Sequence, residues 1–116
     1  LAPDLVDLLW LDEDGFRTLF KGSPVKRAKY QGFLRNVAVA LGNSNHPRAV
    51  AALASRLQHE SPLVRGHCAW ALGRFDDAEA RAALRARHLH ESDAWVLEEI
   101  EAALTHEFGD PSAPVH

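Results

Sequence analysis

SPLVRGHCAWALGRF, residues 61–75, is the stretch that decides the fold of this chain. Ser61 suits the N-cap of a helix and Pro62 suits its first position, because a proline there loses no hydrogen bond. Apolar residues then recur every three to four positions, which predicts a helix from Pro62 to Arg74 with one buried face. This apolar stripe consists of Val64, Cys68, Ala71, Leu72 and Phe75.

The stretch is part of an internal repeat. When residues 38–61 are aligned with residues 69–92, a shift of 31, twelve of the 24 positions are identical. The identical pairs are Ala38/Ala69, Ala40/Ala71, Leu41/Leu72, Gly42/Gly73, Ala49/Ala80, Ala51/Ala82, Ala52/Ala83, Leu53/Leu84, Arg56/Arg87, His59/His90, Glu60/Glu91 and Ser61/Ser92. A period near 31 made of two short helices is typical of a solenoid of stacked helical hairpins. SPLVRGHCAWALGRF resembles the second helix of a HEAT-like repeat, and HPRAVAALASRL, residues 46–57, resembles the first.

Periodicity predicts about seven helices and no strand. Their expected ranges are Pro3–Leu11, Glu13–Phe20, Lys26–Leu41, Pro47–Gln58, Pro62–Arg74, Ala78–His88 and Asp93–Glu107. We expect Asp76 or Asp77 to cap the sixth helix and Ser92 to cap the seventh. The predicted fold is all-α, a short right-handed superhelix of HEAT-like hairpins. By the resemblance to such repeats, the third, fifth and seventh helices form its inner wall.

Length and composition bound the organisation of the chain. The 116 residues suffice for one domain with its own core, which we place at residues 1–108. The helices within residues 1–22 either belong to the solenoid or form a bridge to another domain. Residues 109–116, rich in Pro, Gly and Ser, form a flexible tail. The chain has no methionine, even at position 1, so we interpret it as a piece of a longer protein.

Catalytic and metal-binding motifs are absent from the sequence. There is one cysteine, Cys68, so neither an internal disulfide nor a multi-cysteine metal site can form. Cys68 falls within an apolar stripe, which favours a buried inert thiol over a nucleophile. His59 and His90 occupy equivalent repeat positions, which favours a structural role over metal binding. We expect no catalytic residue, metal site or cofactor in this chain, no membrane-spanning segment, and a cytoplasmic location.

Charge is strongly segregated along the sequence. Residues 1–14 carry −5, residues 15–59 carry +8 without a single acidic residue, and residues 60–116 carry −6, which sums to the net charge of −3. The eight cations of the central part are Arg17, Lys21, Lys26, Arg27, Lys29, Arg35, Arg48 and Arg56.

Most of these cations gather around one helix start. Lys21, Lys26, Arg27 and Lys29 surround the beginning of the expected third helix, where positive charge opposes the helix dipole. A segment under selection for stability alone would carry acids there. We infer that the cluster, with Arg35 further along the helix, serves an anionic partner. The alternative is an ordinary solvated surface.

A second candidate feature lies on the fifth helix. At 100° per residue, His67, Trp70 and Arg74 lie together beside the apolar stripe. The repeat shift maps them onto Asn36, Val39 and Asn43. Cations combined with aromatic rings suit phosphates and unstacked bases, so the strip indicates nucleic acid as the anion. The alternatives are that Trp70 packs between repeats while Arg74 caps a helix, and that the anion is an acidic protein.

The segment LDEDGFRTLFKGSPVKRAKYQGFLRNVAVALGN, residues 11–43, together with SPLVRGHCAWALGR, residues 61–74, closely resembles the C-terminal part of the epoxyqueuosine reductase family. The resemblance covers about residues 1–105, and residues 22–43 are its most specific part. It implies a parent enzyme that uses cobalamin and two 4Fe-4S clusters to reduce epoxyqueuosine to queuosine at the wobble base of tRNA, the last step of queuosine synthesis. The chain departs from the family pattern because the cluster cysteines and the cobalamin-binding region are absent.

The resemblance further implies that the chain is a module that grips the anticodon stem-loop of tRNA. We expect this module to be non-catalytic and monomeric. Phosphate contacts would come from Lys21, Lys26, Arg27, Lys29, Arg35, Arg65 and Arg74. Arg35 and Asn36 would face either the RNA or the missing catalytic domain of the parent. The competing hypothesis is a protein-interaction solenoid that docks an acidic partner or that catalytic domain.

Overall fold

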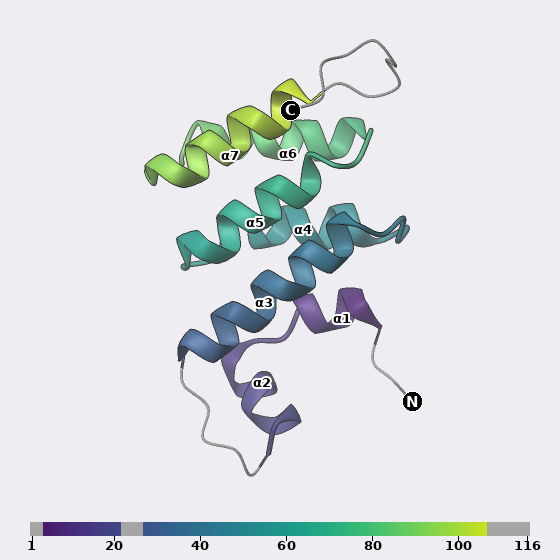
Figure 1. The fold of residues 1–116 in the computed structure, drawn as a ribbon, viewed down its shortest axis with the longest axis vertical. Helices are drawn as coiled ribbons and strands as arrows, with labels where there is room; N and C mark the ends of the chain where they lie inside the picture. The colour runs from purple at the N-terminus through teal and green to yellow at the C-terminus, as the bar shows by residue number, and fades with distance from the viewer. Residues whose placement is uncertain (1–3, 22–26, 107–116) are drawn as a thin grey trace.

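The computed structural model describes residues 4–21 and 27–106, and these form seven helices without a strand (Figure 1). The helices are α1 (Leu5–Leu9), α2 (Glu13–Leu19), α3 (Arg27–Gly42), α4 (Ala49–Arg56), α5 (Pro62–Leu72), α6 (Ala78–His88) and α7 (Ala94–Thr105). The predicted all-α helical repeat is therefore confirmed. The expected tail at 109–116 lies outside the described residues.

The helices stack in two layers along the long axis of the molecule. Helices α3, α5 and α7 follow one another in one layer, and α1, α4 and α6 form the layer behind them (Figure 1). The core between the layers is fully buried and mostly aliphatic. Its large side chains include Leu34, Leu41, Leu53, Leu72, Leu84 and Ile100.

The two N-terminal helices differ in how they pack. Helix α1 contacts α3 and α4 and buries Val6 and Leu9, so it continues the layer of α4 and α6. Helix α2 contacts only α3 among the described helices. Phe16 of α2 is buried there beside Phe33 and Tyr30 of α3, with ring centroids 5.1 and 5.6 Å away.

Helix starts agree with the predictions except at three places. Asp77 caps α6, since its carboxylate accepts a hydrogen bond from the Ala80 N–H at 2.9 Å. Helix α7 is capped by Asp93, which accepts from the Val96 N–H at 3.0 Å, so the predicted Ser92 cap is wrong. The α5 cap at Ser61 and the α7 cap at Asp93 are thus 32 residues apart rather than 31. The other differences are α1 and α4, each of which begins two residues later than predicted, at Leu5 and at Ala49.

The glycines that repeat in the sequence lie where successive helices of the front layer approach most closely. A Cβ atom on Gly73 would lie 2.6 Å from Cβ and 2.8 Å from Cα of Ala103 in α7. A Cβ atom on Gly42 would lie 3.0 Å from Cα of Ala71 in α5. Because Cβ atoms do not approach a backbone this closely, the small residues set the spacing between repeats.

Candidate nucleic-acid interface

The basic segment, which we define as residues 21–35, contributes exposed cations after α2 and in the first turn of α3. Lys21 and Lys29 are exposed, and neither forms an ion pair within the described residues. Arg35 is half-buried, and its Nε donates to Oδ1 of the exposed Asn36 at 3.2 Å. Lys26 lies outside the described residues, and of Arg27 only the backbone is described.

Other cations of the acid-free part of the sequence are engaged within the fold. Arg17 pairs with Glu13 and Asp14 on its own helix. Arg48 pairs with Asp4 at 3.2 Å. The guanidinium of Arg56 donates to the carbonyls of Leu9 and Leu11, which ties α4 to the chain between α1 and α2. Within the acid-free part of the sequence, the cations with described side chains that remain for a partner are therefore Lys21, Lys29 and Arg35.

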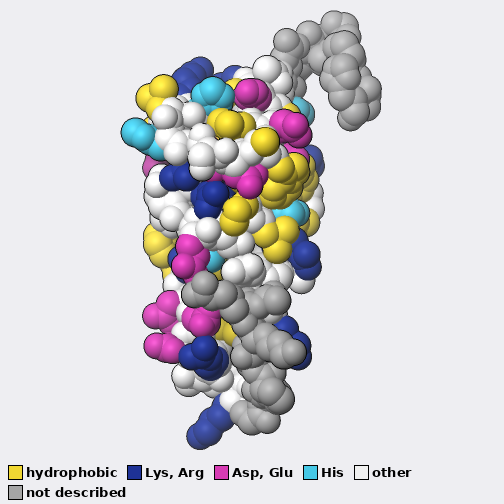
Figure 2. Space-filling model, turned by 90° about the vertical axis from the view of Figure 1, so that its left-hand side faces the viewer, with side chains coloured by type: hydrophobic (Ala, Val, Ile, Leu, Met, Phe, Trp, Pro, Cys, Tyr) yellow, Lys and Arg dark blue, Asp and Glu magenta, His cyan; other side chains and the backbone are white. Residues whose placement is uncertain are grey.

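On the face drawn in Figure 2, lysine and arginine side chains alternate with acidic and hydrophobic ones and do not merge into one sheet of positive charge. Yellow hydrophobic side chains gather at its right-hand edge, which is the side of α3, α5 and α7, with a histidine beside them. A partner on this side would meet apolar surface as well as charge.

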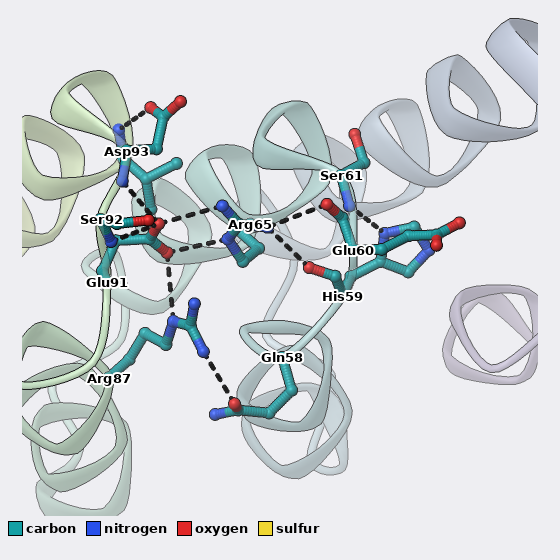
Figure 3. A network of polar contacts seen from close by, with 10 residues as sticks. Gln58, His59, Glu60, Ser61, Arg65, Arg87, Glu91, Ser92 and Asp93 are labelled. Atoms are coloured by element: carbon teal, nitrogen blue, oxygen red, sulfur yellow. Dashed lines mark hydrogen bonds and ion pairs between the residues drawn. The ribbon is translucent and has the colours of Figure 1, made fainter.

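Arg65, which the family resemblance placed at phosphates, is only 9% exposed and serves the fold instead. Its guanidinium forms a bidentate pair with Glu91, through Nε at 2.8 Å and Nη2 at 3.0 Å. Its Nη1 donates to the carbonyls of His59 and Glu60 (Figure 3). Arg65 thereby joins the loop before α5 to the loop before α7, and we leave it out of the interface.

Glu91 is the centre of this polar network. Its side chain is 0% exposed and also accepts from Nε of Arg87 at 3.1 Å. Its Oε2 accepts from the backbone N–H groups of Ser92 and Asp93 (Figure 3). Burial alone would raise the pKa of Glu91, but the hydrogen bonds from Arg65, Asp93 and Arg87 outweigh it and lower the pKa from 4.5 to about 2.

The predicted strip of His67, Trp70 and Arg74 lines and borders a hollow of about 210 Å³ on the front layer. The hollow is lined by Val39 of α3, by Gly66, His67 and Trp70 of α5, and by Trp95 and Glu99 of α7. The equivalence of His67 and Trp70 with positions on α3 predicted such a strip, although Asn36 is not among the lining residues.

The sequence left open whether Trp70 and Arg74 form a surface strip or have structural roles in packing and capping. The structure shows features of both. Trp70 packs between repeats, since a Cβ on Gly42 would lie 2.8 Å from its ring. Arg74 caps a helix, because its Nε donates to the Gly42 carbonyl at 3.1 Å, at the end of α3. Both side chains nevertheless reach the surface, and the guanidinium lies 5.1 Å from the centroid of the Trp70 ring, a cation–π contact.

Trp95 and Glu99 belong to the hollow but were not predicted. The reason is the extra residue between the caps of α5 and α7, which makes the shift between these helices 32. With that shift Glu99 takes the place that His67 holds on α5, and Trp95 takes the place of Leu63. The signal available in the sequence was Asp93, which is an N-cap residue as good as Ser92.

The described side chains are poorly suited to redox or metal chemistry. The Cys68 thiol is buried, and burial raises its pKa to about 12, so it stays protonated at neutral pH. Within residues 4–21 and 27–106, no group of His, Cys, Asp and Glu side chains is arranged to hold a metal ion. A single cysteine does not fit a 4Fe-4S cluster, which needs four such ligands. None of the described helices has the length and apolarity to cross a membrane.

Comparison with known proteins shows that the chain is similar to epoxyqueuosine reductases. It is 45% identical over 69 residues to epoxyqueuosine reductase from Xanthomonas campestris pv. campestris and 43% identical over 75 residues to that from Pseudomonas aeruginosa. These matches cover 59% and 64% of this chain but only 19% and 21% of the relatives, so the chain spans about a fifth of their length. The predicted resemblance is confirmed.

Structural comparison gives the same relation. The crystal structure of an epoxyqueuosine reductase superposes with a TM-score of 0.76 at 25% identity, covering 88% of this chain and 28% of that one. The family model for HEAT repeats matches residues 28–105, which is α3 to α7. The chain therefore belongs to the HEAT-repeat family.

Proposed function

We propose that this chain is the tRNA-recognition module of an epoxyqueuosine reductase and that it holds the anticodon stem-loop for the last step of queuosine synthesis. The observation that carries the proposal is the acid-free basic segment in a chain similar to that enzyme, with Lys21 and Lys29 exposed. Exposed lysines bind a phosphate backbone with little cost in desolvation, and their binding weakens with salt.

Under this proposal the chain itself is non-catalytic and monomeric, and it acts in the cytoplasm. Cobalamin and the 4Fe-4S clusters belong to the part of the longer enzyme that lies outside this chain, because the residues present do not fit a cluster. Lys26 and Arg27 complete the phosphate-binding set with Arg35 and Arg74. Asn36 lies next to Arg35 and orients its guanidinium.

Titration with an anticodon stem-loop, beside an unrelated hairpin, tests the proposal. Because each phosphate contact lowers log K by roughly 0.7 to 0.9 per unit of log salt, binding at about 50 mM salt should weaken strongly at about 200 mM. Lys29→Glu should weaken binding and reduce the salt slope by about one contact. Arg85→Glu, at an exposed position on α6 in the other layer, changes the net charge equally and should leave binding nearly unchanged.

Combined charge reversal at Lys26, Arg27 and Lys29 should abolish binding. Unchanged affinity of that triple variant would contradict the proposal, as would equal losses for Lys29→Glu and Arg85→Glu.

A second candidate function is docking to a protein, such as the catalytic domain of the parent enzyme. The observation that favours it is a set of large hydrophobic side chains exposed at the α1–α2 end, where Trp10 is 52%, Leu19 49% and Phe20 41% exposed. If the stem-loop titration shows no RNA binding at low salt, docking becomes the better explanation.

A further inference from the structure

We propose that the hollow between α3, α5 and α7 binds one unpaired guanine base of the RNA, an inference that rests on the proposed function. At about 210 Å³ the hollow is smaller than the roughly 300–1,000 Å³ pockets that enclose drug-sized ligands. Its size therefore suits one planar ring system better than a cofactor. It lies open on the layer whose α3 also carries the basic segment.

Trp95 supplies a stacking surface that is already in place. A Cβ on Gly66 would lie 2.2 Å from the Trp95 ring, so the indole packs directly over the α5 backbone. The His67 ring contacts it from the side, with centroids 5.3 Å apart. Even so, Trp95 is 38% exposed. An aromatic ring that is held in place yet exposed stacks on a base at low entropic cost.

Trp70 provides a second aromatic wall with a cation at its border. Its ring is held by Gly42 on one side and by the Arg74 guanidinium on another. The only hydrogen bond of that guanidinium within the described residues uses Nε, so Nη1 and Nη2 remain for a phosphate next to the bound base. A protein site that binds an unpaired nucleotide combines stacking on the base with a contact to a neighbouring phosphate.

The polar groups of the hollow select the edge of the base. Glu99 brings a carboxylate, which only accepts hydrogen bonds, and it forms no ion pair within the described residues. Guanine alone among the four bases presents two adjacent donors, N1–H and the 2-amino group, to such a pair of oxygens. Adenine would instead place its N1 acceptor against the carboxylate.

His67 is compatible with the same base. Its Nδ1 lies 2.8 Å from the Leu63 carbonyl and must donate to it, because a carbonyl cannot donate. The other ring nitrogen, Nε2, then accepts a hydrogen bond when the ring is neutral. An aliphatic side chain of a protein partner would satisfy neither this nitrogen nor Glu99, which is why we assign the hollow to a base.

The inference can be tested with two five-nucleotide RNAs, UUGUU and UUAUU, which differ at one position. Their affinities for the full chain are measured by tryptophan fluorescence. We expect UUGUU to bind at least about tenfold more tightly. Glu99→Gln replaces one acceptor by a donor and should reduce that preference to within about threefold. The matched control is Glu98→Gln, an exposed neighbour that does not line the hollow and should keep the preference.

Trp95→Ala should weaken the binding of both RNAs. Trp10→Ala, which removes the exposed tryptophan at the C-cap of α1, should not. Thermal melting verifies that each variant is folded. Equal binding of the two RNAs by the native chain, or equal behaviour of the two Gln variants, would overturn the guanine site. The stem-loop titration with Lys29→Glu runs in parallel. If the guanine test fails but the stem-loop titration still shows salt-sensitive, Lys29-dependent binding, then only the guanine site is contradicted and the proposed function stands.

Discussion

At the scale of single residues, the buried Glu91 is held by ion pairs with two arginines, Arg65 and Arg87. Two cations and two backbone N–H groups converge on one carboxylate that has no contact with solvent. Glu60, its equivalent in the preceding repeat, is exposed. The two equivalent glutamates thus have different roles, because Arg65 pairs with the carboxylate of Glu91 but with the backbone carbonyl of Glu60.

This difference leads to a prediction about Glu91→Gln. Removing the charge leaves Arg65 and Arg87 buried without an anion, so the free energy of unfolding at pH 7 should fall by about 3 kcal/mol. Since the pKa of Glu91 is lowered from 4.5 to about 2 in the folded chain, this stabilisation is complete above pH 4.5 and is lost as the pH falls toward 2. The variant and the native chain should therefore converge in acid.

Urea unfolding of the native chain and Glu91→Gln between pH 7 and pH 2 measures both effects. The exposed Glu98→Gln serves as the control and should change the free energy of unfolding by less than about 0.5 kcal/mol. A constant difference between native chain and Glu91→Gln across this pH range would contradict the assigned pKa.

At the scale of helices, glycines decide how closely α3, α5 and α7 stack. Gly73 caps α5 with ordinary helical backbone angles, so its conformation does not require glycine. What requires it is the contact with Cα and Cβ of Ala103. Gly32, in the middle of α3, has a very different environment, since among the described residues an added Cβ would meet Nη2 of Arg35 alone, at 3.6 Å.

The pair Gly73→Ala and Gly32→Ala should therefore have opposite effects. Gly73→Ala forces α5 and α7 apart and should lower the free energy of unfolding by about 1–3 kcal/mol. Gly32→Ala gains helix propensity without a clash and should raise it by up to about 1 kcal/mol. Chemical denaturation of the two variants compares them directly, and stabilisation by Gly73→Ala would show that the two helices can separate without cost.

At the scale of the whole molecule, α5 is the central helix. It contacts α3, α4, α6 and α7, whereas α2 contacts only α3 among the described helices. In a solenoid, stability is shared between neighbouring units, so inner elements open only when several interfaces are lost and outer ones open locally.

We expect hydrogen exchange to follow this order. The amides of α5 should exchange most slowly, those of α2 fastest, and those of α6 between them. Helix α6 is the matched comparison because it is as long as α5, at 11 residues, but lies in the other layer. Native-state exchange followed by mass spectrometry or NMR measures the order, and protection of α2 equal to that of α5 would contradict it.

The seven helices, the repeat of two helices and the concentration of cations at residues 21–35 can all be predicted from the sequence alone. Helix periodicity, caps and prolines act over a few residues, so they can be interpreted without knowing the neighbours. The burial of Arg65 and the exposure of Arg74 follow from the tertiary structure, because both fall in the stretch that the sequence predicts as one helix, whereas the structure ends α5 at Leu72. The tertiary structure also brought Trp95 and Glu99 to His67 and Trp70, because one extra residue before α7 rotates that helix by about 100° relative to the repeat. Which side chains meet depends on the register between helices, and that register is set by close packing between segments far apart in the chain.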